Sequence, residues 1–385
     1  MNLLFVCTSL EPGRDGVGDY TRLLASACAD AGHTCALLAI NDGHLKDSTP
    51  VVQETQFERG HTFPVLRLSP DKPWTARYEH AQSFVATHAP EWVSWQIVPY
   101  GFHPKGIIPD SAFEFARLGE GRLNHLMLHE LWIGLSLGEP LKNRVYGFLQ
   151  RRALMAFIQC LAPALIDTSN PAYRSVLVHE GCTPGVLPLC GNIPIEPMPP
   201  VPRGDEWVGG IFGTVHTQLD PRPCISALAR GAKASKRTLR ILGFGRLGAY
   251  GDKLFAQLKD EYSHRSIVIE NLGERPQAEV SRLLQSLDFG IGTHPWALIG
   301  KSGAVSAMLD HGIPVIVPRD DWSLRRPPTP PPLRDSLIVR LSDTPSELMA
   351  GWLSRRRPPQ SRLPALAAAF LSRLNRVADP APHPQ

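Results

Sequence analysis

The sequence predicts an α/β protein with two Rossmann-like domains, each built around a parallel sheet. The main observation is that apolar runs of strand length alternate with amphipathic stretches of helix length along almost the whole chain. The length of 385 residues also exceeds what one hydrophobic core usually organises. Finally, a proline-rich stretch near the middle divides the alternation into two halves.

The first half begins with an apolar run at residues 3–7, which is typical of a central parallel strand buried on both faces. A loop with Gly13, Gly16 and Gly18 follows, and residues 19–31 carry apolar side chains on one helical face. We therefore predict an N-terminal Rossmann-like domain over residues 1–195. Its further predicted strands are 34–40, 92–97, 124–128, 164–168 and 186–189, and its further helices are 74–88, 141–160 and 172–179.

Five prolines between residues 194 and 202 interrupt this pattern, because proline suits neither a helix interior nor a central strand. We place a linker at 196–206 and a second Rossmann-like domain at 207–360. A C-terminal helix over 361–377, which can pack back on the N-terminal domain, and a disordered tail over 378–385 complete the prediction. The strands predicted for the second domain are 208–212, 239–242, 266–269, 289–292 and 313–317, and its helices lie around 225 and at 253–262, 277–287 and 303–310.

Composition and charge exclude several classes of protein. A net charge of +4 at pH 7 is far from the strongly basic character of a dedicated nucleic-acid binder, so no nucleic-acid partner is predicted. The seven cysteines are scattered, without CxxC spacing or histidines at zinc-ligand spacing, which predicts reduced thiols and no metal site. Neither a run of about 18 apolar residues nor a signal-peptide pattern occurs, so we predict a cytoplasmic protein.

The late part of the chain is rich in arginine. Such a patch suits anionic lipid head groups on the inner face of a membrane or a polyanionic acceptor, and a solvated surface is an equally good interpretation. Peripheral membrane contact through this region is therefore one of the predicted interactions. The arginines concerned are Arg319, Arg325, Arg326, Arg334, Arg340, Arg355, Arg356 and Arg357.

The first segment that carries chemistry is the glycine loop at residues 13–20, between a buried strand and a helix. Glycines let the backbone approach a ligand closely, and a helix start offers unpaired N–H groups and partial positive charge to an anion. A glycine-rich connection without any ligand is the alternative interpretation.

The second segment spans residues 298–317, where Lys301, Ser302 and Gly303 precede a short helix and an apolar strand. Lys301 supplies a charge, the Ser302 hydroxyl a hydrogen bond, and Gly303 room for a diphosphate at the helix start. This combination predicts a phosphate site at a sheet edge. The alternative is a solvated lysine beside a serine that merely caps the helix.

These two segments resemble the retaining GT-B glycosyltransferases of family 4 (group 1). Residues 16–18, Gly-Val-Gly, and a helix ending in Ala-Gly-His at 31–33 resemble the family's N-terminal glycine loop. Residues 307–316, AMLDHGIPVI, resemble its C-terminal element, and residues 271–273 and 287–289 resemble the segments that flank the nucleobase. The resemblance covers most of the chain and implies the GT-B fold, with two Rossmann-like domains facing across a cleft that closes over a nucleotide-sugar.

The resemblance also implies roles for individual residues, with the acceptor on the first domain and the donor on the second. His129, at the end of a predicted strand, would lie beside the transferred sugar, although a histidine followed by Glu130 is otherwise a buried structural residue. His129 and Lys301 are the predicted catalytic residues. The predicted donor-binding residues are Gly16, Gly18, His216, Gly273, Glu274, Gly300, Ser302 and Gly303, and the weaker acceptor-binding candidates are Asp19, Tyr20, Gln96 and Tyr100.

Two departures from the family pattern stand out. The two glutamates of the family's E-x7-E motif are replaced by Leu298 and Ser306, which cannot accept hydrogen bonds as a carboxylate does. The cationic pair expected after the first strand of the second domain is absent from residues 213–221. Lys301 and His216 are predicted to supply the missing charge. The alternative is that donor binding has been lost.

The sequence thus predicts a hexosyltransferase-like, metal-independent enzyme without a cofactor, which transfers a sugar from a nucleoside-diphosphate-sugar with retention. The acceptor would be a glycan, a lipid-linked molecule or a small molecule. One alternative is a GT-B epimerase acting on a nucleotide-sugar, with Glu130 and His294 as acid and base. Another is a catalytically degenerate GT-B protein that binds a partner.

Overall fold

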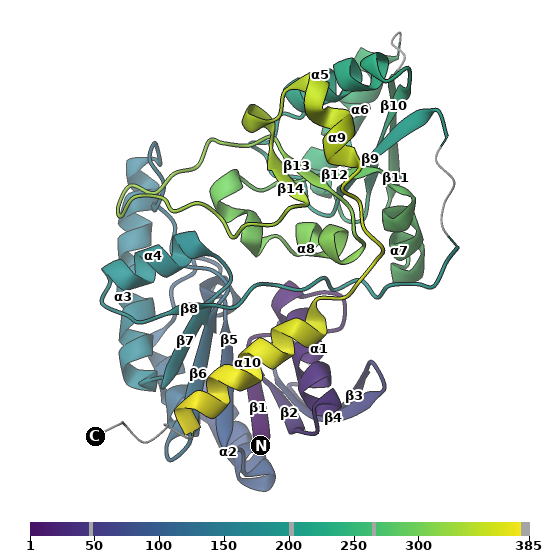
Figure 1. The fold of residues 1–385 in the computed structure, drawn as a ribbon. Coiled ribbons are helices and arrows are strands. Elements are labelled where there is room, and N and C mark those ends of the chain that lie inside the picture. Colours follow the sequence, from purple (N-terminus) through teal and green to yellow (C-terminus); the bar gives the residue numbers. More distant parts are fainter. Residues whose placement is uncertain (46–48, 200–203, 264–266, 379–385) are drawn as a thin grey trace, which may run out of the picture. The chain divides into compact units, whose positions relative to one another are not determined.

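The computed structural model describes residues 1–45, 49–199, 204–263 and 267–378, and the chain divides into two compact units (Figure 1). Unit 1 comprises Met1–Pro188, Leu324–Pro330 and the C-terminal segment from Leu363. Unit 2 comprises Leu189–Ser323 and Pro331–Arg362. The first division therefore falls after Pro188 and not at the predicted residue 195.

Hydrogen bonds explain why residues 189–199 belong to unit 2. The N–H of Gly191 donates to Oδ2 of Asp310 at 3.1 Å, and the N–H of Glu196 donates to Oγ of Ser281 at 2.9 Å. The predicted linker at 196–206 is therefore held against unit 2 at its start, while residues 200–203 lie outside the described residues. Proline content indicates an extended chain here, but it does not say which unit that chain packs on.

The sheet of unit 1 has eight strands among the described residues, in the order β3-β4-β2-β1-β5-β6-β7-β8, and all pairs are parallel except β3 with β4. The central strands are apolar because helices cover both faces of the sheet. The strands are β1 (Asn2–Cys7), β2 (Thr34–Ala39), β3 (Val51–Glu58), β4 (His61–Leu68), β5 (Trp92–Ile97), β6 (Leu123–Leu128), β7 (Leu165–Thr168) and β8 (Gly185–Val186).

The hairpin of β3 and β4 is absent from the sequence prediction. Its two-residue turn, Arg59 and Gly60, has positive φ angles of 48° and 89°, as a tight antiparallel hairpin requires. Strand β3 lies at the sheet edge and is mostly polar and partly exposed, so it lacks the apolar pattern that identifies the buried strands.

Two groups of helices cover the sheet of unit 1. Helices α1 and α10 pack side by side on one face, where the ring of Phe370 lies 6.0 Å from that of Phe5 in β1 (Figure 1). On the other side, Phe115 of η2 contacts the rings of Trp74 and Tyr78 in α2. The bounds are α1 (Gly16–Asp30), α2 (Trp74–His88), η1 (Pro99–Gly101), η2 (Asp110–Gly119), α3 (Leu141–Leu161), α4 (Pro171–His179) and α10 (Leu363–Ala378).

Residues 324–330 belong to unit 1, although the sequence predicts that they are part of the second domain. Leu324 pairs with Ser136 in an isolated antiparallel bridge, and the N–H of Arg325 donates to the carbonyl of Leu135 at 2.9 Å. These are backbone contacts between segments nearly two hundred residues apart, which local sequence patterns do not report. The predicted tail is described only at Ala378, which ends α10.

The sheet of unit 2 has six strands among the described residues, all parallel, in the order β11-β10-β9-β12-β13-β14. Its elements are β9 (Glu206–Phe212), α5 (Arg222–Ala234), β10 (Thr238–Phe244), α6 (Gly248–Tyr262), β11 (Ile267–Gly273), α7 (Gln277–Ser286), β12 (Phe289–Ile291), η3 (Trp296–Lys301), α8 (Gly303–Asp310), β13 (Val315–Val317), β14 (Ile338–Arg340), η4 (Leu341–Asp343), η5 (Ser346–Leu348) and α9 (Met349–Leu353).

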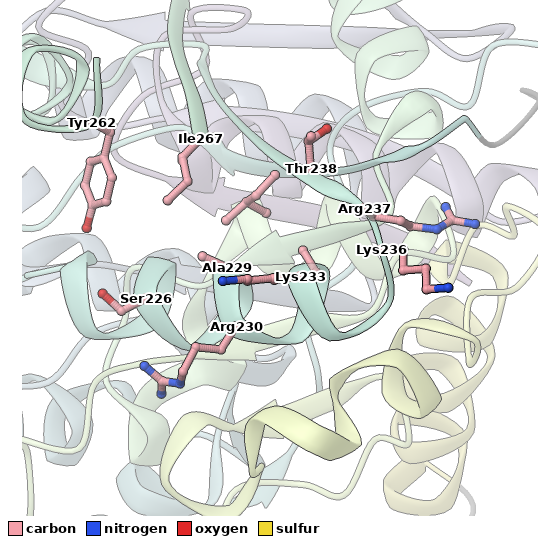
Figure 2. Close-up of a pocket in the computed structure, with 11 residues that line it drawn as sticks. Ser226, Ala229, Arg230, Lys233, Lys236, Arg237, Thr238, Tyr262 and Ile267 are labelled. Atoms are coloured by element: carbon pink, nitrogen blue, oxygen red, sulfur yellow. The ribbon is translucent and has the colours of Figure 1, made fainter. Parts of the chain in front are cut away.

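A pocket of about 760 Å³ opens between the end of α5 and the first residues of β10 and β11 (Figure 2). Four cations line it, Arg230, Lys233, Lys236 and Arg237, together with apolar side chains such as Ile267. Because these are the amino-terminal ends of the strands, the pocket lies at the edge of the sheet opposite to the one where parallel sheets usually bind their ligands.

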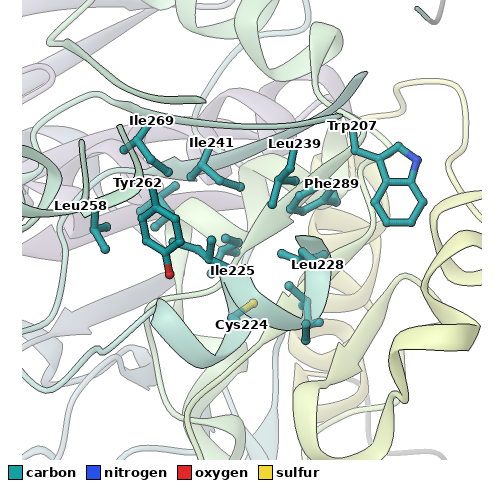
Figure 3. Packing of buried hydrophobic residues seen from close by; sticks show 14 of the residues in the cluster. Trp207, Cys224, Ile225, Leu228, Leu239, Ile241, Leu258, Tyr262, Ile269 and Phe289 are labelled. Carbon is teal, nitrogen blue, oxygen red and sulfur yellow. The ribbon is translucent and has the colours of Figure 1, made fainter. Parts of the chain in front are cut away.

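The core of unit 2 is divided by its sheet. On one face, Ile225 and Leu228 of α5 and Leu258 of α6 pack against Ile241 of β10 and Phe289 of β12 (Figure 3). On the other face, side chains of α7 and α8 pack against β10 and β13. Helices on both faces of a parallel sheet make unit 2 a doubly wound domain, as the alternation of elements predicts.

Candidate functional site

The start of α1 differs from the predicted glycine loop. Helix α1 begins at Gly16, so Gly16 and Gly18 lie in its first turn and not in a loop before it. Asp15 caps this turn, and its Oδ1 accepts the N–H of Gly18 at 2.7 Å. Burial raises the pKa of the Asp15 carboxyl. The capping carboxylate therefore already satisfies one of the N–H groups that the prediction offered to a donor phosphate.

The two glycines have different surroundings. A Cβ atom on Gly18 would lie 2.5 Å from the carbonyl oxygen of Ser9, so the close approach of α1 to the β1–α1 loop requires glycine there. A Cβ atom on Gly16 would meet no atom within 4 Å. Packing accounts for Gly18 without a ligand, whereas Gly16 remains open.

Substituting these glycines separates the two roles. We expect Gly18→Ala to lower the free energy of unfolding by about 1–3 kcal/mol, because the added methyl group overpacks against backbone. Gly16→Ala should change it by no more than about 0.5 kcal/mol, because the added group points into open space. Denaturant unfolding of both variants measures the difference. Equal costs at the two positions would show that the contact with Ser9 is not what requires Gly18.

His129, Gln96 and Tyr20 come together at the carboxyl edge of the sheet of unit 1. His129 directly follows β6, is 8% exposed, and its Nε2 lies 2.9 Å from Oε1 of Gln96. The ring of Tyr20 meets that of His129 edge-on at 4.9 Å. Because an amide oxygen can only accept, Nε2 carries the proton and Nδ1 is the acceptor nitrogen.

His129 is a neutral imidazole. Burial, with a smaller contribution from nearby His125, lowers its pKa to about 3. Protonation would place a charge in a site without a carboxylate partner in direct contact, which is costly. The position of His129 therefore agrees with its predicted place at the end of a strand. Its burial agrees with the alternative, that His129 is a buried structural residue.

A buried polar chain runs from this edge to the C-terminal helix. Nε2 of Gln96 donates to Oγ of Ser94 at 2.8 Å, and that hydroxyl lies 2.8 Å from Nδ1 of His125. Nε2 of His125 lies 3.3 Å from the carboxylate of Asp167, which forms a two-pronged ion pair with Arg373 of α10. We call the set His129, Gln96, Ser94, His125, Asp167 and Arg373 the buried polar chain.

The remaining acceptor candidates have partners of their own. Asp19 is buried, pairs with Arg22 and accepts the N–H of Gly13 at 2.9 Å. The hydroxyl of Tyr100 accepts from Nε2 of Gln150 in α3 at 3.2 Å. Both side chains therefore have structural contacts that would account for them without an acceptor.

In unit 2, three basic side chains gather around His294 at the carboxyl edge of the sheet. The rings of His294 and His216 lie 5.8 Å apart. Burial, with a smaller contribution from the neighbouring basic groups of Lys301, His216 and Arg319, lowers the pKa of His294 to about 3. Nδ1 of His294 is buried and has no hydrogen-bond partner among the described residues. We call His216, His294, Lys301 and Arg319 the His294 cluster.

The arginine-rich character of the late part of the chain predicts that Arg319 belongs to a surface patch. The structure contradicts this, because Arg319 is only 5% exposed. Its guanidinium donates to the carbonyl of Thr293 at 3.2 Å, to Oε1 of Gln218 at 2.7 Å and to Asp321 at 2.6 Å. Its place just after β13, at a strand end, is the signal that would have identified it.

The start of α8 lies next to this cluster in sequence. Ser302 is 1% exposed, and its Oγ accepts the N–H of Val305 at 3.3 Å, so it caps the helix. A Cβ atom on Gly303 would meet no atom within 4 Å, which leaves the backbone after the cap open. Leu298 and Ser306, at the positions of the family's glutamates, are each 7% exposed.

Gly273 ends β11 and Glu274 follows it, at the same edge of the sheet. Gly213, Gly245 and Gly273 end three adjacent strands with φ angles of 74°, 82° and 68°, which favour glycine. Glu274 lies 3.8 Å from Arg246 in an exposed ion pair. The structure thus places Gly273, Glu274 and the His294 cluster at the carboxyl ends of strands in one sheet.

No group of three or more His, Cys, Asp or Glu side chains in the described part of the chain could hold a metal ion. Within the described ranges, no helix has both the length and the apolar character needed to cross a bilayer.

Solved structures of similar architecture cover nearly the whole chain. A glycosyltransferase from Rickettsia africae superposes with a TM-score of 0.56 at 9% identity, covering 98% of this chain and 99% of that one. Sucrose-phosphate synthase from Thermosynechococcus elongatus gives 0.54 at 11% identity, covering 98% of both chains. Anabaena HepE, in complex with UDP and glucose, gives 0.53 at 15% identity, covering 97% and 95%. Neither a family model nor a curated protein sequence matches the chain.

These likenesses define the fold. Two α/β units with parallel sheets, matched over their full length by glycosyltransferase structures, confirm the predicted GT-B fold. At identities of 9–15% they define no more than the fold, and membership of family 4 stays a prediction.

Proposed function

We propose that this chain is a glycosyltransferase that moves a sugar from a nucleoside-diphosphate-sugar to an acceptor. The observation that carries the proposal is the His294 cluster, in which Lys301 and buried Arg319 gather at the carboxyl edge of the sheet of unit 2. The GT-B fold supports it, because a solved glycosyltransferase shares that fold and another structure of the same fold was solved with UDP and glucose.

The chemistry of the cluster suits a departing diphosphate. Transfer leaves negative charge on the leaving group, and fixed positive charge nearby lowers the energy of the transition state. Lys301 and Arg319 supply that charge, and the open backbone at Gly303 adds the N–H groups of a helix start. Neutral His294 offers to a ligand group its Nδ1, which has no hydrogen-bond partner among the residues that the structure describes.

The finer parts of the proposal come from the family resemblance. They are retention at the anomeric carbon, acceptor binding by unit 1, and a place for His129 beside the transferred sugar. In this proposal His129 acts as a neutral group, because burial holds its pKa near 3. Its Nδ1 could then accept from a sugar hydroxyl while Nε2 stays on Gln96.

The first test removes the lysine of the cluster. We expect Lys301→Ala to weaken nucleoside-diphosphate binding by about 1–3 kcal/mol, roughly 5- to 150-fold in Kd, because a charge-assisted contact is lost. Calorimetric titration with UDP, ADP and GDP measures it. Lys259→Ala is the matched control, since this exposed lysine lies near the end of α6, and it should leave Kd unchanged. Unchanged affinity in Lys301→Ala would remove the phosphate assignment.

A second experiment tests the reaction itself. The protein is incubated with mixed nucleotide-sugars and candidate acceptors, and released nucleoside diphosphate and glycosylated product are both measured. Product with the donor's anomeric configuration supports retaining transfer. An epimerised nucleotide-sugar would favour the epimerase, and the absence of binding by every nucleoside diphosphate would favour a degenerate binding protein.

A further inference from the structure

Exposed apolar side chains concentrate on one short segment of unit 1. Eleven large hydrophobic side chains are exposed among the described residues, and five of them fall between residues 137 and 149. Their exposed fractions range from 43% to 70%. Scattered surface hydrophobics are ordinary, whereas a contiguous group indicates a binding surface. We call these five the apolar stripe: Leu137, Leu141, Val145, Phe148 and Leu149.

The stripe lies on the outer face of α3. Residues 141, 145, 148 and 149 have the i, i+4, i+7, i+8 spacing that places side chains on one side of a helix. The opposite side holds the helix in place: a Cβ atom on Gly147 would lie 1.9 Å from the carbonyl oxygen of Ile133, and Gln150 accepts the N–H of Ile133 at 2.9 Å. Since the inner face anchors α3, the stripe has no role in holding the helix to unit 1.

Charge identifies what would cover the stripe. Helix α3 contains four cations, Lys142, Arg144, Arg151 and Arg152, and no aspartate or glutamate. Arg151 pairs with Glu180 at 2.5 Å, while Lys142, Arg144 and Arg152 are in no ion pair within the described part of the chain. An exposed apolar face bordered by unpaired cations on an acid-free helix has the chemistry of an interfacial membrane helix.

We propose that the outer face of α3 docks unit 1 on an anionic membrane surface. The apolar stripe enters the boundary between head groups and acyl chains, and Lys142, Arg144 and Arg152 contact lipid phosphates. This surface replaces the arginine run near the C-terminus as the membrane contact. The guanidinium of Arg355 donates to the carbonyl of Ser336 and that of Arg357 to its hydroxyl, so both are engaged within unit 2. The proposal does not rest on sugar transfer.

Flotation of the full chain with lipid vesicles tests the apolar contribution. The chain should float with vesicles of equal parts phosphatidylcholine and phosphatidylglycerol, and much less with phosphatidylcholine alone. Phe148→Ser should lower the partition coefficient by about tenfold or more, because a half-exposed phenyl ring loses its burial in lipid. Phe57→Ser is the matched control: Phe57 is 71% exposed on β3 of the same unit, outside the stripe, and its removal should leave binding unchanged.

A second pair of variants tests the charge without touching an apolar residue. Lys142→Gln should lower binding to the anionic vesicles about fivefold, and added salt should weaken binding of the parent protein. Lys72→Gln, at an exposed lysine outside α3, should leave it unchanged. Failure of the parent to float with anionic vesicles would overturn the proposal, as would equal losses in Phe148→Ser and Phe57→Ser. A third result would also overturn it: sedimentation without lipid shows a dimer of the parent protein, and Phe148→Ser dissociates that dimer but leaves vesicle binding unchanged.

Discussion

Replacing Arg373 by methionine is expected to lower the free energy of unfolding by about 3–5 kcal/mol, the cost of breaking a buried ion pair from one side. Nε and Nη2 of Arg373 each lie 2.9 Å from an oxygen of Asp167. The carboxylate is fully buried, and its other neighbour is His125 at 3.3 Å. Without the guanidinium, a charge buried in the sheet of unit 1 loses its main partner.

Three further variants isolate this effect. Arg376→Met lies one turn away on the exposed side of α10 and should cost no more than about 0.5 kcal/mol. The double variant Asp167→Asn/Arg373→Met should cost less than the sum of the two single changes. The reason is that the double variant removes both partners of the ion pair and so leaves no unpaired charge. Denaturant unfolding gives all four values. A cost for Arg373→Met equal to that of Arg376→Met would mean that the pair does not hold α10 in place.

Mild acid is expected to destabilise the protein through His129 and His294. Both are held neutral by burial, with pKa values of about 3 against an ordinary value of 6.5. The unfolded chain takes up a proton at each as pH falls below 6.5, whereas the folded chain does not. The free energy of unfolding therefore falls by about 1.4 kcal/mol per pH unit per histidine, and this loss continues until pH approaches 3.

The measurement is denaturant unfolding at several pH values between 7 and 4. In His129→Asn, which keeps an amide to meet Gln96, the slope of stability against pH should fall by about 1.4 kcal/mol per unit. His294→Asn is the matched change in unit 2 and should lower the slope by a similar amount. Slopes identical to that of the parent protein in both variants would show that these imidazoles are protonated in the folded chain.

Several elements lie where local pattern alone places them. Helix α2 (Trp74–His88), strand β5 (Trp92–Ile97) and helix α8 (Gly303–Asp310) follow the predicted residues closely. Each has its periodicity within a contiguous stretch, so nothing distant is needed to recognise it. Chain order likewise places His129, directly after a strand, and Lys301, between a strand and the next helix, on the carboxyl side of parallel sheets.

Other features depend on contacts that no local pattern contains. Edge strand β3 lacks an apolar face, so the sequence contains no hydrophobic pattern that identifies it as a strand. Gly18 is explained by Ser9, and Arg319 by Thr293 and Gln218. In each case the decisive partner comes from a different element of the chain.

The sequence by itself determined the class of fold, the alternation of strands and helices, and the strand ends where chemistry is to be sought. Only the tertiary structure decided that Arg373 closes a buried polar chain, that Arg319 is buried, and that α3 leaves an apolar stripe exposed. The physical reason is that burial and pairing belong to the neighbourhood a side chain acquires on folding, whereas periodicity belongs to the chain itself.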